Sequence, residues 1–147
     1  TLEEALWMRL MLMLGAGESS AGISLENAQR LIEKGLSNTQ NGFAKGLREL
    51  ITTPATWIGC VEFEGVTRCG ASERWAAHFA GPIDSLSNWM FDAPSEGAAG
   101  YRRRCPTRII GLVNVSAAAE YVLEKADNFG VPVGAWEARS SQVGCVG

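Results

Sequence analysis

The chain has 147 residues, of which 46% are hydrophobic, and a net charge of −3 from 13 basic and 16 acidic side chains. This size fits one globular domain, residues 1–147, that can bury a core of its own. The small net charge argues against strong attraction to nucleic acid or to an anionic membrane, and it favours a neutral polymer or a small molecule as partner.

The first segment, Leu2 to about Gly15, has apolar residues around most of a helical circumference. It therefore predicts a central, buried helix rather than a surface helix. The run is too short to span a membrane and carries Glu3, Glu4 and Arg9, so no stable membrane span is expected. Gly15 and Gly17 are expected to end the helix.

Two more helices are expected before Pro54. Ser24 is placed to cap a helix over LENAQRLIEK, which Gly35 would close. A further helix is expected from Asn41 to Ile51, ended by Thr52-Thr53-Pro54.

The stretch WIGCVEFEGVTRCG alternates apolar and polar residues on both sides of Glu64-Gly65. It predicts a β-hairpin with a two-residue turn at Glu64-Gly65. The register of that hairpin places Cys60 opposite Cys69. Facing residues in such a ladder lie close enough for a disulfide, so a Cys60–Cys69 bridge and a pair of buried thiols are both open. Cys105 and Cys145 can form a second bridge. Paired cysteines favour a periplasmic or other extracytoplasmic location.

After the hairpin the chain is expected to return to helices. Ser72 would cap a helix over ERWAAHFA, and a short helix is expected around Ser85 to Phe91. SEGAAGYRRRCP is typical of a loop, TRIIGLVNV of a buried strand, and Ser116 to Asn128 of a helix that Gly130 ends.

These elements predict a mostly helical α+β domain with a central buried helix and one small β-hairpin. A competing interpretation takes TRIIGLV, the following helix and VPVGAW as a βαβ unit. No CxxC pair is present and the chain has one histidine, so neither a metal site nor a cofactor is expected.

Glu18 is the candidate catalytic residue, because it follows the most apolar segment of the chain. A carboxyl group at the edge of an apolar core loses solvation, which raises its pKa and lets it act as a general acid. In a glycosidase such an acid protonates the glycosidic oxygen. The alternative is an ordinary solvated glutamate in a glycine-rich loop.

A hydrophobic helix that runs into Glu18-Ser19 resembles the lysozyme-like superfamily, in which the catalytic acid stands at the end of a central helix. In lytic transglycosylases that acid is commonly followed by serine. The resemblance implies a lysozyme-like fold, Glu18 as the acid and Ser19 as a substrate contact.

A second segment, GYRRRCPTRIIGLVNVSAAAEY, is similar to a stretch of the family 19 glycosidases. Tyr101, Arg102, Arg104, Gly111 and Asn114 coincide with it. Because the asparagine of that family lines the sugar cleft, the resemblance implies that Asn114, with Tyr101 and Arg102, contacts substrate. An amide can both donate and accept hydrogen bonds to sugar hydroxyls.

A second carboxylate would be needed for a two-acid glycosidase. Glu62 and Glu64 lie on or beside the predicted hairpin, which borders the cleft in lysozyme-like folds. Glu62, on the same strand face as Cys60, is the candidate second acid, because Glu64 is a turn residue that is more typically solvated. If neither reaches Glu18, the resemblance implies a transglycosylase with a single acid. His78, amid apolar neighbours, is more typical of packing than of catalysis.

The leading hypothesis is a monomeric, peptidoglycan-cleaving muramidase outside the cytoplasm, of the kind that serves bacteriophage lysis. Two alternatives remain open. One is a non-enzymatic extracytoplasmic or virion-associated interaction domain, in which Glu18 is incidental. The other is a chitinase of the same fold.

Overall fold

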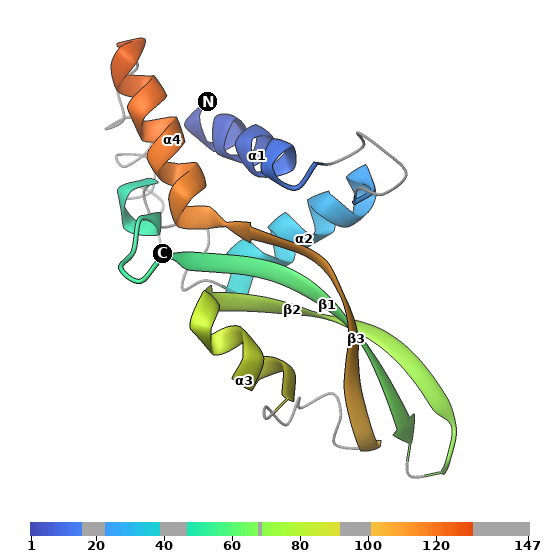
Figure 1. Cartoon of the computed structure of the whole chain (residues 1–147). Helices are drawn as coiled ribbons and strands as arrows, with labels where there is room; N and C mark the ends of the chain where they lie inside the picture. Colours follow the sequence, from blue (N-terminus) through green and yellow to red (C-terminus); the bar gives the residue numbers. More distant parts are fainter. Residues whose placement is uncertain (16–22, 39–46, 68, 92–100, 131–147) are drawn as a thin grey trace, which may run out of the picture.

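A computed structural model describes residues 1–15, 23–38, 47–67, 69–91 and 101–130, with the backbone alone at residues 38, 67 and 101–104. Within these ranges, four α-helices accompany a three-stranded antiparallel sheet (Figure 1). The expectation of a mostly helical, lysozyme-like domain is therefore wrong. The strands have 12, 11 and 14 residues, far more than one small hairpin would supply.

The bounds of the elements confirm several predicted segments and correct others. In chain order they are α1 (Leu2–Met13), α2 (Leu25–Asn38), η2 (Leu47–Leu50), β1 (Thr56–Thr67), β2 (Ser72–Pro82), η3 (Ile83–Ser85), α3 (Leu86–Phe91), β3 (Tyr101–Asn114) and α4 (Val115–Asn128). The helices predicted at α2, α3 and α4 and the strand within β3 are confirmed. VPVGAW, the last part of the alternative βαβ unit, lies outside the described residues.

Helix boundaries follow the local capping residues. The Ser24 hydroxyl accepts a hydrogen bond from the backbone N–H of Asn27 at 3.2 Å, as expected of the cap of α2. Gly15 and Gly130, with φ of 66° and 68°, adopt the left-handed conformation just beyond α1 and α4. Of the helix predicted over Asn41 to Ile51, the described part holds only the short 3-10 helix η2.

The sheet has the order β2-β1-β3, with β1 antiparallel to both neighbours. The turn between β1 and β2 comes after Thr67, not at Glu64-Gly65, which pair with Arg74 and Glu73 inside the hairpin. The helix expected over ERWAAHFA is thus wrong, because these residues form β2. Their alternation places Trp75, Ala77 and Phe79 on one face, and pairing with β1 outweighs the helical preference of the alanines.

On one face of the sheet, α2 packs against β1 and β2 and α4 packs against β1, while α1 packs against α2 and α4; together they enclose the main core. Helix α2 lies very close to β1 at Gly35, where a Cβ would fall 2.6 Å from the Cβ of Ile58. The sequence predicts that Gly35 ends the helix, but the helix continues to Asn38. The missing Cβ of Gly35 instead allows close helix–sheet packing. The core consists of Leu6, Leu10, Ala28, Leu31, Ile32, Leu36, Leu47, Ile58, Cys60, Val113, Val115, Ala118 and Ala119 with their neighbours.

The opposite face carries a smaller aromatic cluster beneath α3. The Phe63 ring stacks on Trp75 with 5.8 Å between centroids, and it meets Trp89 of α3 edge-on at 5.7 Å. Phe79 contacts the same indole at 5.4 Å. The sheet therefore buries side chains on both faces, which explains why β1 has so few polar positions near its centre.

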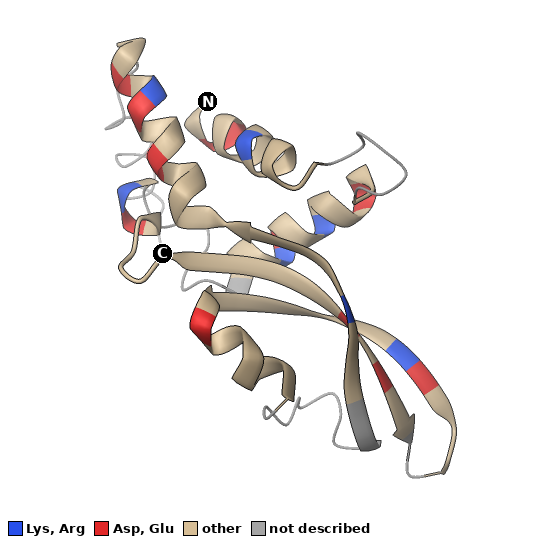
Figure 2. Ribbon diagram, in the orientation of Figure 1, with Lys and Arg blue, Asp and Glu red and all other residues tan. Residues whose placement is uncertain are grey.

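Beyond α1, α2 and α4 the three strands continue as a curved extension, which Figure 1 shows projecting away from these helices. We call this extension the sheet arm and define it as residues 62–67, 72–76 and 101–108. These segments pair with one another, with register shifts between β1 and β3 at Glu62/Phe63 and at Val66/Thr67. Figure 2 shows charged residues along the arm and on α4.

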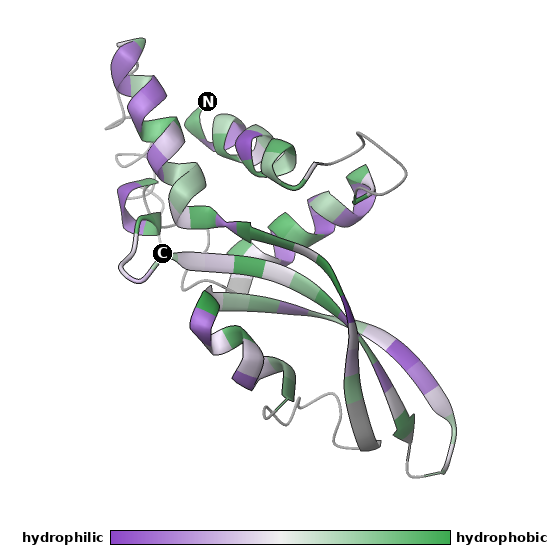
Figure 3. Ribbon diagram, viewed as in Figure 1, coloured by the Kyte–Doolittle hydropathy of each residue, from purple (hydrophilic) through white to green (hydrophobic). Residues whose placement is uncertain are grey.

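Helix α1 is not the central buried helix that its composition predicts. Only Leu6 and Leu10 are buried in it, while Met8 and Leu12 expose 66% and 63% of their surface. Figure 3 shows α1 hydrophobic along most of its length although it lies at the periphery, against α4 and α2. No helix in the described ranges is long and apolar enough to cross a membrane.

Candidate functional site

The predicted acid cannot be placed in this fold. Glu18 and Ser19 lie outside the described residues, just after the end of α1. The role of Glu18 as general acid and that of Ser19 as substrate contact both stay predictions.

Asn114 has a defined structural role. It is the last residue of β3 and the N-cap of α4, and its side-chain oxygen accepts a hydrogen bond from the backbone N–H of Ala117 at 2.9 Å. Such a cap stabilises a helix by about 1 kcal/mol. A sugar contact by Asn114 would have to share this oxygen with the helix.

The residues that resemble the glycosidase stretch are not brought together. Tyr101 pairs with Thr67 near the tip of the sheet arm, whereas Asn114 pairs with Trp57 at the other end of β3. A strand of 14 residues spans roughly 45 Å. Tyr101 and Arg102 therefore cannot share one sugar subsite with Asn114 within this strand.

Glu62, the predicted second acid, is engaged by the neighbouring strand. One of its carboxylate oxygens lies 3.6 Å from an Arg108 guanidinium nitrogen. The Thr107 hydroxyl donates to the Glu62 carbonyl at 3.1 Å and lies 3.4 Å from its other carboxylate oxygen. Glu64 likewise pairs with Arg74 at 2.6 Å. Both carboxylates thus serve cross-strand ion pairs on the arm.

The predicted Cys60–Cys69 disulfide is not formed. Both residues are free thiols, as is Cys105. The reason is the longer hairpin, whose register sets Cys60 opposite His78 and leaves Cys69 beyond the end of β1. Cys145, the proposed partner of Cys105, lies outside the described residues. The disulfide argument for an extracytoplasmic location therefore loses its basis, and that location stays a prediction.

Cys60 and His78 form a cross-strand pair below α2, but their environment does not activate them. Burial raises the pKa of the Cys60 thiol. Burial also lowers the pKa of His78, and the charges of Lys34 and Arg30 lower it further. A reactive cysteine needs the thiolate form, usually stabilised by an imidazolium. Here both groups are held neutral, so the pair lacks the charge separation of a Cys–His catalytic dyad.

Described residues form at least two concave regions, of which one is polar. A hollow on the sheet arm is lined by Glu64, Gly65, Val66, Ser72, Glu73, Arg74 and Cys105. Two of its charged side chains, Glu64 and Arg74, are paired with each other. No group of three or more potential metal ligands occurs in the part of the chain that the structure describes.

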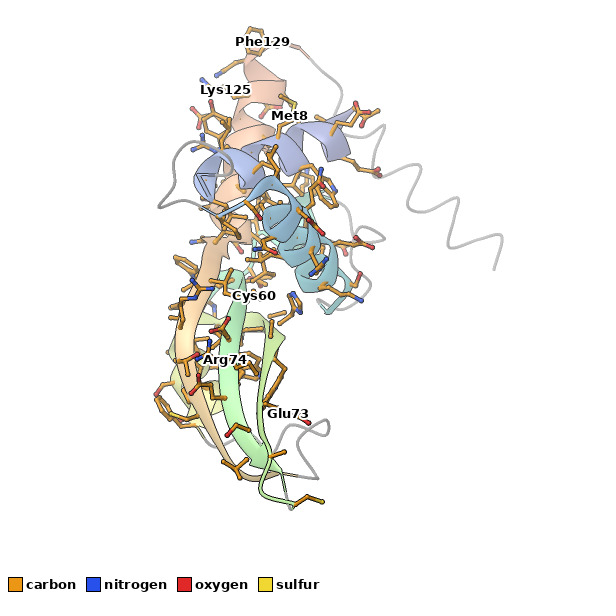
Figure 4. All side chains as sticks on the ribbon, turned by 90° about the vertical axis from the view of Figure 1, so that its right-hand side faces the viewer. Met8, Cys60, Glu73, Arg74, Lys125 and Phe129 are labelled. Atoms are coloured by element: carbon orange, nitrogen blue, oxygen red, sulfur yellow. The ribbon has the colours of Figure 1, made fainter. Side chains whose placement is uncertain are left out.

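A second concave region is apolar and lies where α1 meets α4. A pocket of about 340 Å³ is lined by Thr1, Leu2, Ala5, Tyr121, Val122, Lys125, Ala126 and Phe129. Phe129, at its rim, is 80% exposed. Figure 4 shows Met8, Lys125 and Phe129 at this end of the molecule and Glu73 and Arg74 at the other, with Cys60 between them.

Met8 and Leu12 extend this apolar surface along α1. In a helix, residues three and four apart share a face, so Ala5, Met8 and Leu12 form one stripe. The side chains of Met8 and Leu12 are largely exposed. We call the pocket and this stripe together the α1/α4 face.

Both signs of charge occur at the α1/α4 face: the Glu4 carboxylate lies 2.8 Å from the ammonium of Thr1 in the pocket lining, and two cations lie near the Tyr121 ring. The Arg9 guanidinium lies 3.8 Å from the centroid of the Tyr121 ring, and the Lys125 ammonium lies 5.4 Å from the same centroid. Among the described residues, no carboxylate lies within ion-pair distance of either cation. Arg9 Nε is buried and has no hydrogen-bond partner there.

The sequence contains one indication of this face, namely that α1 is apolar around most of its circumference. Helix α1 is apolar on nearly every side, yet a helix at the edge of a domain can bury only the side that meets its neighbours. The unburied remainder is then an exposed apolar surface. The apolar composition of α1 predicts a central helix, and for that reason it does not predict Met8 and Leu12 as surface residues.

No protein-family model matches the chain, and comparisons with curated proteins and with solved structures likewise find no match.

Proposed function

We propose that this chain is a protein-interaction domain that docks a partner through the α1/α4 face. The supporting observation is an apolar pocket that exposed Phe129 helps to line, with exposed Met8 and Leu12 on the same face of α1 as the lining residue Ala5. Single exposed apolar residues are normal on a protein surface, but a contiguous apolar patch beside a concave pocket marks a binding surface. Covering it removes apolar area from water, which favours association by roughly 25 cal/mol per Å² before the costs of binding.

The test uses two phenylalanines that are both highly exposed at helix ends. A photo-crosslinking amino acid is placed at Phe129 or, as the matched control, at Phe91 of α3, which is 66% exposed. We expect a partner to be captured from position 129 and not from position 91. The identified partner is then purified, and its Kd is measured by calorimetry against the full chain.

Substitutions decide whether that contact uses the proposed face. Met8→Ser and Leu12→Ser should each weaken the purified complex about tenfold, which corresponds to about 1.4 kcal/mol. Phe91→Ser should leave the affinity unchanged. A partner whose affinity is insensitive to all changes on the α1/α4 face contradicts the proposal.

Peptidoglycan cleavage by a muramidase and chitin cleavage by a chitinase both stay predictions of the sequence, and the first has an independent test. Purified sacculi are treated with the wild-type chain and with Glu18→Gln, and turbidity is followed. The interaction-domain proposal expects no clearing by either protein. Clearing by the wild type that falls by 10²–10⁴ in Glu18→Gln would replace the proposal with an enzyme in which Glu18 is the acid.

A further inference from the structure

The α1/α4 face has a defined shape that limits what can bind to it. Ala5, Met8 and Leu12 form an apolar stripe along α1, and α4 rises beside one end of that stripe to close the pocket. Helix α1 has 12 residues and is therefore about 18 Å long. A single element of similar length can lie along the stripe and place one end in the pocket.

This inference rests on the proposed function: we propose that the partner presents a short amphipathic helix, whose apolar side chains cover the stripe and whose carboxylate pairs with Lys125.

The helical form of the partner segment follows from backbone hydrogen bonding. The stripe lies along the middle of α1, where the backbone N–H and C=O groups bond within the helix, whereas the pocket lies at the first turn of α1 and the last turns of α4. An extended segment laid along the stripe would lose water from its own backbone groups without gaining partners there, at a cost of a few kcal/mol for each group. A helix brings its backbone bonds with it. Its apolar residues, spaced by three and four, match the spacing of the stripe.

The carboxylate follows from the placement of charge. Lys125 is the only charged side chain that lines the pocket among the described residues. The Thr1 ammonium, which also lines the pocket, is already paired with Glu4 at 2.8 Å. At 100° per residue, Glu3 of α1 and Glu120 and Asp127 of α4 point away from the side that carries the pocket residues. An acidic group on the partner would therefore meet a cation that has no ion pair within the described chain.

A second copy of the chain is a poorer occupant than a single helix. A face one helix long and two helices wide covers about 18 Å by 20 Å, or roughly 360 Å². A stable protein–protein interface buries about 800 Å² on each side. The α1/α4 face supplies about half of that area, which is enough for a helical peptide but small for a dimer.

The experiment selects ligands without assuming an identified partner. A displayed library of 14-residue helix-forming peptides, varied in apolar and charged residues, is selected on the full chain. It is counter-selected on the full chain carrying Met8→Ser and Leu12→Ser, whose exposed positions leave the fold intact. We expect enriched peptides to carry apolar residues three and four apart and an Asp or Glu.

A charge swap then tests Lys125 directly. In fluorescence anisotropy, Lys125→Glu should weaken an enriched acidic peptide about tenfold, and replacing the peptide's acid by Lys should restore affinity to the Lys125→Glu chain. Arg74→Glu, at the opposite end of the molecule, is the matched control and should change nothing. Circular dichroism of each variant confirms that it is folded.

Several results would overturn the inference. One is that the enriched peptides bind equally well to the chain that carries Met8→Ser and Leu12→Ser. Others are that the selection enriches basic or extended, proline-containing peptides, or that it enriches no peptide. A fourth is that replacing the acid of the peptide by Lys fails to restore affinity for the Lys125→Glu chain. A dimer in sedimentation that Leu12→Ser dissociates would assign the face to a second copy. If crosslinking still maps a purified partner to position 129 through a non-helical segment, the proposed function survives and only this inference fails.

Discussion

The helical end of the molecule and the sheet arm are stabilised by different interactions. At the helical end, α1, α2 and α4 bury aliphatic side chains against one face of the sheet. On the arm, cross-strand ion pairs such as Glu62–Arg108 and Glu64–Arg74 lie beside one aromatic cluster under α3. Burial of apolar area is worth several kcal/mol per large side chain, whereas an exposed ion pair is worth less than about 1 kcal/mol. Stability should therefore be concentrated at the helical end.

The largest expected effect on the free energy of unfolding comes from the buried side of α1. Leu10 is fully buried, whereas Leu12, two residues later, is 63% exposed. Leu10→Ala should lower the free energy of unfolding by about 2–5 kcal/mol because it leaves a cavity in the core. Leu12→Ala should change it by less than about 0.5 kcal/mol. Urea denaturation of both variants measures the difference, and equal losses would mean that α1 is buried on both sides.

A smaller effect is expected where α4 is tied to the start of β1. The buried Ser116 hydroxyl donates to the Leu50 carbonyl at 2.8 Å and accepts from the backbone N–H of Thr56 at 2.9 Å. It also accepts from the Thr52 N–H at 3.3 Å. Ser116→Ala leaves these groups without a partner, so it should cost about 1–3 kcal/mol. Ser87→Ala, at an exposed position of α3, is the control, and a similar loss there would remove the buried network as the cause.

The smallest effect is expected on the arm. A double-mutant cycle with Glu64→Gln and Arg74→Gln should give a coupling energy of about 0.2–1 kcal/mol, which 1 M NaCl should reduce. Both side chains are substantially exposed despite their separation of 2.6 Å. A coupling above 2 kcal/mol, insensitive to salt, would show that the arm contributes as much as the core and would reverse the comparison.

Much of the helical end could be predicted from the sequence, because its signals are local. Ser24 is a capping residue, Gly130 supports a left-handed helix end, and the apolar run in β3 is a strong strand signal. These features depend on a few neighbouring residues. The segments that became α2, α3 and α4 were identified for that reason.

The arm and the burial of α1 could not be predicted in the same way. Glu64-Gly65 has the residues of a tight turn, but alternation continues on both sides of it, and the longer pairing to Ser72 satisfies more backbone groups. Composition shows that α1 is apolar, yet not which side meets α4. Of the candidate site, Glu62 and Asn114 were found in other roles, and the α1/α4 face depends on tertiary packing alone.

The junction of β3 and α4 has a mechanical consequence. Asn114 ends the strand and caps the helix, so no connecting loop lies between them (Figure 1). The backbone angles of that one residue set the direction of the helix relative to the strand. The arm tip and the apolar pocket therefore lie at opposite ends of β3 and α4, which follow each other without a loop. A twist imposed on β3 would reorient α4, which forms one wall of the pocket.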